Sequence, residues 1–128
     1  VIDGRNAVMG RLASYAAKQA LKGEEVIILN CEHIIITGNK ANIKKEFEEE
    51  RSKMGHGMRG PKHIKTSERM VKRVIRGMLP GHKFGRGREA YGRIKCYVGI
   101  PKEFESAKKI GSEKEKRIKF SSVGEFAK

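Results

Sequence analysis

The sequence predicts an α/β fold in which helices flank a parallel sheet, and two observations support this. A pattern of helical period lies between two short apolar segments, at residues 1–3 and 25–30, which is the order of a strand–helix–strand unit with a right-handed crossover. The second segment, EVIILN, is continuously apolar rather than alternating. Such a run is typical of a strand that is buried on both faces of a parallel sheet.

The first strand is expected at residues 1–3 and the first helix over residues 8–22, where Gly23 ends it. The apolar side chains that recur at helical spacing are Met9, Leu12, Ala13, Ala16, Ala17, Ala20 and Leu21.

HIIIT, at residues 33–37, predicts another buried strand. Only Cys31 and Glu32 separate it from the preceding strand, and two residues are too few for a parallel crossover. Either the chain bends sharply at this point or the sheet is mixed. A turn at Gly38-Asn39 then leads into a strongly charged, exposed helix over residues 41–53.

The most distinct helical pattern is KTSERMVKRVIRGML, which begins at residue 65 with Thr66 or Ser67 as N-cap and Glu68 in its first turn. At about 100° per residue, the apolar and the cationic side chains occupy separate sectors. The apolar sector holds Met70, Val71, Val74, Ile75 and Met78, and the cationic sector holds Arg69, Lys72, Arg73 and Arg76. One face can therefore pack on the sheet while the other presents four cations.

The remaining elements are shorter. A loop rich in Gly and His is expected at residues 54–65, a short helix at residues 88–93, and a strand at residues 94–98 that Pro101 ends. A mixed-charge surface segment follows, and SSVGEFAK is expected to begin a capped terminal helix.

Positive charge is concentrated in the middle of the chain. The net charge is +14 over 128 residues, and residues 51–102 carry 15 Lys or Arg but only 2 Glu. Because solvated faces usually mix both signs, this excess indicates a polyanionic partner. The longest apolar runs, residues 26–29 and 34–36, are far shorter than the roughly 20 residues of a membrane span. Nucleic acid is therefore favoured over a membrane.

The segment RGMLPGHKFGRGREAYGR, residues 76–93, combines Gly and Arg with a single carboxylate, Glu89. Arg can contact a phosphate through two N–H groups, and Lys adds a point charge. The aromatic residues among these cations, Phe84, Tyr91 and Tyr97, are few for a single-strand stacking platform. This favours a folded RNA that is bound through its backbone and shape.

Glycine and histidine motifs suggest other sites, which their context disfavours. Residues 55–60 match GxGxxG and residues 85–90 match GxGxxA, but neither follows a strand, as a dinucleotide site requires. We expect these glycines to let the backbone approach a phosphate chain closely. The histidines lack metal-ligand spacing, and no GxSxG, Walker or HExxH motif occurs. No catalytic, metal or cofactor residue is therefore expected, while His56, His63 and His82 could contact RNA.

Cys31 and Cys96 lack CxxC spacing and are expected to be free, buried, reduced thiols in a cytosolic protein. We expect a single domain, residues 1–128, with an α/β core at 1–50, a basic RNA-binding section at 51–93 and the last strand with a C-terminal extension at 94–128.

Four segments, taken together, resemble the thirteenth protein family of the large ribosomal subunit, in its archaeal branch. They are VIDGRNAVMGRLAS, IIITGNK, RGMLPGHKFGRGREAYGRIKCYVGIP and IKFSSVGEF. The resemblance spans nearly the whole chain and keeps the motif order. RGMLP followed by a basic loop and a KxYxG strand is its most specific part, and the segment NIKKEFEEERSKMGHGMRGPKH is less distinctive.

The resemblance implies a three-layer α/β/α fold around a mostly parallel sheet of about four strands. It implies a structural, non-catalytic protein of the large ribosomal subunit that binds its rRNA and helps it assemble, in the cytoplasm and beside neighbouring large-subunit proteins. No cofactor, membrane or small-molecule substrate is implied. Residues 76–80 then correspond to the family's signature helix end, and residues 37–40 to its characteristic turn.

The distribution of charge adds the expected RNA-binding residues, with Arg5 and Arg11 as further candidates. The expected set is Arg59, Lys62, His63, Lys65, Arg69, Lys72, Arg73, Arg76, Lys83, Arg86, Arg88 and Arg93. Two other functions stay open from the residues alone. One is a small nucleotide-dependent enzyme on the same scaffold, and the other is an RNA-binding regulator outside the ribosome.

Overall fold

The main sheet of the protein consists of three parallel strands. The structure, a computed structural model, describes residues 1–53, 65–111 and 119–126. The strands of the main sheet, in spatial order, are β1 (Ile2–Asp3), β2 (Val26–Leu29) and β4 (Ile94–Cys96). β2 lies in the centre, where Ile28 pairs with Ile2 on one side and with Cys96 on the other. This central position explains why the segment is continuously apolar.

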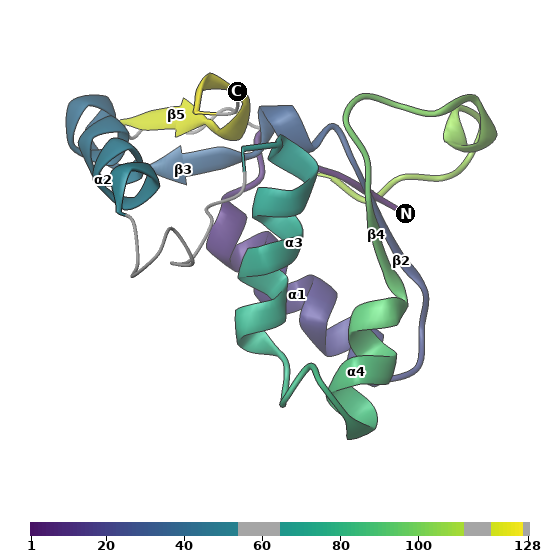
Figure 1. The fold of residues 1–128 in the computed structure, drawn as a ribbon. Helices are drawn as coiled ribbons and strands as arrows, with labels where there is room; N and C mark the ends of the chain where they lie inside the picture. The colour runs from purple at the N-terminus through teal and green to yellow at the C-terminus, as the bar shows by residue number, and fades with distance from the viewer. Residues whose placement is uncertain (54–64, 112–118, 127–128) are drawn as a thin grey trace.

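Three helices pack together beside this sheet. They are α1 (Met9–Leu21), α3 (Ser67–Met78) and α4 (Gly85–Gly92). α1 connects β1 to β2 and contacts both α3 and α4, whereas α3 contacts β4, as Figure 1 shows. The predicted α/β class with a mostly parallel sheet is confirmed.

The chain bends sharply after β2, which decides between the two alternatives for HIIIT. Asn30 adopts a left-handed conformation with φ 53°, and a 3-10 turn, η1 (Cys31–His33), follows. β3 (Ile35–Thr37) then leaves the main sheet and pairs antiparallel with β5 (Phe120–Ser122). The expected sheet of about four strands is thus divided into three parallel strands and a separate antiparallel pair.

Helix α2 (Lys40–Ser52) is exposed, as expected, and none of its residues is fully buried. The side chain of Asn39 caps it, because Oδ1 accepts a hydrogen bond from the backbone N–H of Ala41 at 3.0 Å. The ring of Phe47 stacks on that of Phe126 with centroids 5.1 Å apart, and the Arg51 guanidinium donates to the Phe126 carbonyl. These contacts attach α2 to the C-terminal segment.

The expected terminal helix is wrong over the part that the structure describes. The backbone of Phe120–Ser122 forms β5, and Val123–Glu125 makes only one 3-10 turn, η4. The hydrogen bond from the Val123 N–H to the Ile34 carbonyl, at 2.8 Å, shows why. Pairing with the edge of β3 satisfies backbone groups that a local helix would have satisfied within the segment.

The basic middle of the chain contributes to the hydrophobic core. Met70, Val71, Ile75 and Ala90 belong to one buried cluster that also includes residues of α1, β2 and the C-terminal turn. The apolar face of α3 is therefore packed in the core and holds the cationic face in place.

None of the helices in the described part of the chain could span a membrane.

Candidate RNA interface

Helix α3 directs its apolar side chains into the core and its cations outward. Met70, Val71 and Ile75 are buried, and only Met78, which is 45% exposed, departs from the expected apolar face. Leu79 ends the helix, as expected, and Thr66 is its N-cap residue although its side chain makes no capping hydrogen bond.

Among the described residues, no carboxylate forms an ion pair with the four cations of α3, although Glu68 lies one turn before Lys72 on the same helix. Arg69 is exposed, and Lys72, Arg73 and Arg76 are half-buried. Within the part of the chain that the structure describes, no carboxylate oxygen lies within 4.0 Å of any of their charged nitrogens. Because like charges three and four residues apart on a helix repel, this arrangement costs stability unless an anion binds.

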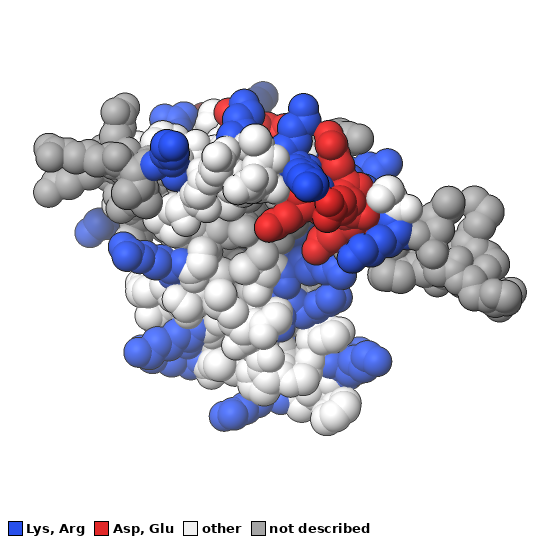
Figure 2. All heavy atoms as spheres, turned by 90° about the vertical axis from the view of Figure 1, so that its left-hand side faces the viewer, with Lys and Arg blue, Asp and Glu red and all other residues white. Residues whose placement is uncertain are grey.

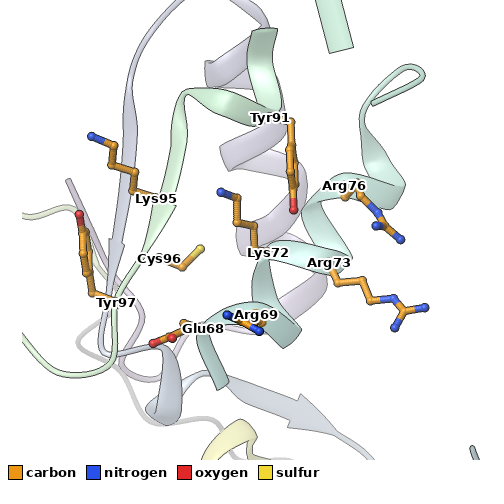
Figure 3. Close-up of a pocket in the computed structure, with 9 residues that line it drawn as sticks. All are labelled: Glu68, Arg69, Lys72, Arg73, Arg76, Tyr91, Lys95, Cys96 and Tyr97. Carbon is orange, nitrogen blue, oxygen red and sulfur yellow. The ribbon is translucent and has the colours of Figure 1, made fainter. Parts of the chain in front are cut away.

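A groove of about 460 Å³ runs between α3 and β4. This volume lies within the range of ligand-binding sites in proteins, about 300–1,000 Å³. Figure 3 shows that α3 forms one wall, β4 the other, and the ring of Tyr91 one end. The lining residues are Glu68, Arg69, Lys72, Arg73, Arg76, Tyr91, Lys95, Cys96 and Tyr97.

Lys72 is held inside this groove. Its Nζ lies 4.7 Å from the centroid of the Tyr91 ring, which is a cation–π contact, and Figure 3 shows its side chain between Tyr91 and β4. The ammonium group is therefore oriented before any ligand arrives, which lowers the entropy that binding would cost.

The two cysteines are distant in the sequence but meet where β2 and β4 end. The Cys31 N–H donates to the Tyr97 carbonyl at 3.2 Å, and the Tyr97 N–H donates to the Ile28 carbonyl at 2.9 Å. Both thiols are free. The neighbouring Cys31 thiol, and after it Lys72, lower the pKa of Cys96 more than burial raises it. The neighbouring Cys96 thiol and burial raise the pKa of Cys31, whose own thiol donates to the Ile28 carbonyl at 3.8 Å.

The glycine- and arginine-rich segment folds back on itself. α4 begins at Gly85, with φ 68°, three residues before the expected start of this helix. Gly87 is buried, and a Cβ atom there would lie 2.6 Å from the carbonyl carbon of Pro80 and 2.7 Å from the carbonyl oxygen of Gly81. The expectation that this glycine approaches a phosphate is wrong, because it approaches the preceding turn of its own chain.

All the predicted RNA-binding residues except Arg93 fall into three groups. Those exposed around α3 and α4 are Lys65, Arg69, Lys83, Arg86 and Arg88, and those half-buried along α3 are Lys72, Arg73 and Arg76. The third group, Arg59, Lys62 and His63, lies outside the described residues, as does the first glycine motif. Arg5 and Arg11 are exposed but do not line the groove.

Arg93 has a structural role that the sequence does not indicate. Its Nη1 donates to the Ala20 carbonyl at 3.0 Å, and its Nη2 lies 3.8 Å from the carboxylate of Glu89. Arg93 therefore ties the end of α4 to the end of α1. His82 lies beside Tyr91, with ring centroids 6.4 Å apart.

Sequence reasoning missed the β4 wall of the groove. Lys95 and Cys96 are not among the expected contact residues, and the sequence indicates Tyr97 only as one of few aromatic residues among the cations. The KxYxG pattern contains both Lys95 and Tyr97, but only the fold shows that β4 lies beside α3. Among the described residues, no cluster of His, Cys, Asp and Glu could hold a metal ion.

Acidic residues are concentrated away from the groove. Figure 2 shows most of the Asp and Glu side chains of one face gathered in a cluster, with Lys and Arg distributed around it. Helix α2 carries four acidic residues, Glu46, Glu48, Glu49 and Glu50, which its four cations balance. A polyanion would therefore be attracted more strongly to the α3 side than to α2.

Comparison with known proteins agrees with these features. A model of the family described as ribosomal protein L13 matches residues 1–103. The chain belongs to this family. It is 44% identical to large ribosomal subunit protein uL13 of Methanocaldococcus jannaschii, over 100% of this chain and 94% of the relative.

Other archaeal members of the L13 family are similarly close. The protein of the same name from Methanococcus maripaludis is 42% identical over 99% of this chain and 93% of the relative. That from Methanosarcina barkeri is 46% identical over 86% of this chain and 78% of the relative. The resemblance to the archaeal branch is thereby confirmed.

Proposed function

We infer that this L13-family chain is a structural, non-enzymatic constituent of the large ribosomal subunit, as the family and the names of its relatives indicate. It acts there by associating with ribosomal RNA and so supports translation. We place it in the cytoplasm with the ribosome, beside other large-subunit proteins.

We further propose that the RNA contacts the surface formed by α3, the start of α4 and the groove beside β4. The observation that carries this proposal is the amphipathic helix α3. Its apolar face is buried in the core, and its four cations have no carboxylate within 4.0 Å among the described residues. A rigid row of cations releases counterions from an RNA backbone without a large ordering cost.

The contact surface that we propose combines side chains of α3 with exposed cations around α4. The described residues in it are Lys65, Arg69, Lys72, Arg73, Arg76, Lys83, Arg86, Arg88 and Lys95. Arg59, Lys62 and His63 remain proposed contacts on the strength of their sequence position alone. Arg93 is a weaker candidate, because its guanidinium group already binds Ala20 and Glu89.

The basic section and the α/β core act as one folding unit in this proposal. Met70, Val71 and Ile75 join the same buried cluster as Ile28 and Ile94 of the sheet. Removing the basic section would therefore also remove part of the core. The RNA-binding surface is thus positioned by the fold rather than attached to it as a separate arm.

Ultraviolet cross-linking tests the position of this surface. The protein would be bound to the large-subunit rRNA of Methanocaldococcus jannaschii, irradiated and digested, and the cross-linked peptides identified by mass spectrometry. We expect cross-links in peptides from α3 and β4 and none in α2. Cross-links concentrated in α2 would contradict the proposed surface, since the charges of α2 cancel and give RNA no net attraction there.

A further inference from the structure

We propose that Cys31 and Cys96 form a redox-reactive pair, in which Cys96 reacts with a small-molecule disulfide and Cys31 then attacks the adduct to close an internal disulfide. The pair lies at the bend after β2, beside the end of β4. This modification site goes beyond the proposed function and does not depend on RNA binding. Such a pair needs an accessible thiol that forms its thiolate readily and a second thiol beside it.

The backbone brings the two thiols together from distant parts of the sequence. The Ile28 carbonyl lies 3.8 Å from the Cys31 Sγ and also accepts the Tyr97 N–H at 2.9 Å. Tyr97 directly follows Cys96, and its own carbonyl accepts the Cys31 N–H at 3.2 Å. Cys31 belongs to the buried core cluster, against which Cys96 packs. The two side chains therefore meet at one junction that backbone hydrogen bonds hold in place.

The two cysteines differ in the way that such a reaction requires. Cys96 is half-buried and lines the groove, and Figure 3 shows it on the side of β4 that faces α3. Cys31, in contrast, is fully buried. The Cys31 thiol, and after it Lys72, lower the pKa of Cys96, whose thiolate therefore forms first. A reagent in the solvent can thus reach a reactive thiolate at Cys96 but cannot reach Cys31.

Oxidised glutathione, a small disulfide, is the oxidant in this reaction. The Cys96 thiolate attacks one glutathione sulfur, the S–S bond of the reagent breaks, and the departing glutathione thiolate takes up the proton that Cys96 has lost. Cys31 then loses its proton and attacks the Cys96 sulfur of the mixed disulfide, which releases the second glutathione with that proton. Two protein thiols are oxidised to one disulfide, and one oxidised glutathione is reduced to two thiols.

The first step also prepares the second. The Cys96 thiol beside Cys31, together with burial, raises the pKa of Cys31. Because the mixed disulfide consumes the Cys96 thiol, Cys31 forms its thiolate more readily once the adduct is present. Its position against Cys96 then makes the attack intramolecular, whereas a free glutathione must first meet the adduct from solution.

The test incubates the reduced full chain with oxidised glutathione, without RNA, and identifies the products by mass spectrometry after quenching with acid. We expect a chain that has lost two hydrogen atoms, and a non-reducing digest should contain the Cys31 peptide linked to the Cys96 peptide. The Cys96–glutathione adduct should be at least about tenfold less abundant, because the second step is intramolecular. A stable adduct on Cys96 without an internal disulfide would overturn the proposal.

Two variants separate the roles of the two thiols. Cys31→Ala should stop the reaction at the Cys96–glutathione adduct, which then accumulates. Cys96→Ala should leave Cys31 unmodified, because Cys31 is buried. Rapid modification of Cys31 in a folded Cys96→Ala chain would contradict the assigned order of attack. The result with the unaltered chain does not depend on how either variant folds.

The same reaction in urea shows whether the fold brings the thiols together. Unfolding removes the junction, so that a long flexible segment separates the two cysteines and ring closure becomes slow. Glutathione should then be found on both cysteines, and the internal disulfide should form at least about tenfold more slowly than in the folded chain. Equal rates of closure in the two states would overturn the proposal, as would dimers linked through Cys96 in place of the internal disulfide.

Discussion

Reversing two charges on α3 should strongly weaken RNA binding and leave folding nearly unchanged. The variant carries Arg73→Glu and Arg76→Glu. The matched control carries Lys44→Glu and Lys45→Glu on α2, which changes the net charge by the same amount. Any difference between the two therefore depends on where the charges lie and not on how many there are.

The loss of affinity follows from the contacts that disappear. A hydrogen bond to a charged group contributes about 1.5–3 kcal/mol, so two lost phosphate contacts should weaken binding by about 100-fold or more. Each lost contact also reduces the slope of log affinity against log salt by about 1. We therefore expect the slope to fall by about 2 in the α3 variant.

Stability should change little because two effects oppose each other. A carboxylate at position 76, in the last turn of α3, is unfavourable with the helix dipole by about 0.3–1 kcal/mol. However, carboxylates at positions 73 and 76 lie four residues after Arg69 and Lys72, and each such pair contributes about 0.2–0.5 kcal/mol. The net change in the free energy of unfolding should remain below about 1 kcal/mol.

Electrophoretic mobility shifts on Methanocaldococcus jannaschii large-subunit rRNA, at several salt concentrations, measure the affinity and its slope. Urea unfolding measures stability in parallel. Equal affinities of the α3 variant and the α2 control, with both proteins folded, would refute the assignment of α3 as the RNA-contacting helix.

Two further predictions follow from the packing and from the thiols. Gly87→Ala should destabilise the protein by about 2 kcal/mol or more in urea, because the new Cβ would lie 2.6 Å from the Pro80 carbonyl carbon. Gly77→Ala, on the exposed side of α3 with nothing within 4 Å, should instead stabilise it by about 0.5–1 kcal/mol, and equal effects would contradict this account. Iodoacetamide should modify Cys96 before Cys31 as the pH is raised, because Cys96 has the lowered pKa and forms its thiolate first. Mass spectrometry measures the rate at which each thiol is modified, and equal rates for both thiols would argue against this order.

Local sequence patterns were sufficient to predict the helices that are determined by residues close together in the sequence. α1 ends at Leu21, before Gly23, as its apolar period and the glycine predicted. α3 shows the expected separation of buried Val71 and Ile75 from outward cations. In both helices, residues three and four positions apart determine the buried face, so the pattern can be read along the chain.

The antiparallel sheet could not be predicted because its cause is not local. β3 pairs Ile35 with Ser122, 87 positions later in the chain. The polar residues of SSVGEFAK indicate a helix cap when read alone, and only the exposed edge of β3 makes a strand there more favourable. The register of such a pair depends on tertiary packing, which a single sequence does not reveal.

The candidate site shows the same limit. The cations of α3 were evident from the sequence, but the groove exists only because β4 lies beside that helix. Gly87 illustrates a second limit, because a glycine in a basic segment is compatible with close approach to a phosphate or to the protein's own backbone. The contact with Pro80 decides between them.

The most direct test of the central claim is sedimentation of a tagged chain from cell extract through a gradient at high salt. High salt removes basic proteins that are held only by loose contacts with the RNA backbone. We predict that the chain migrates with the large ribosomal subunit under these conditions. Migration at the top of the gradient would contradict its role as a structural constituent of that subunit.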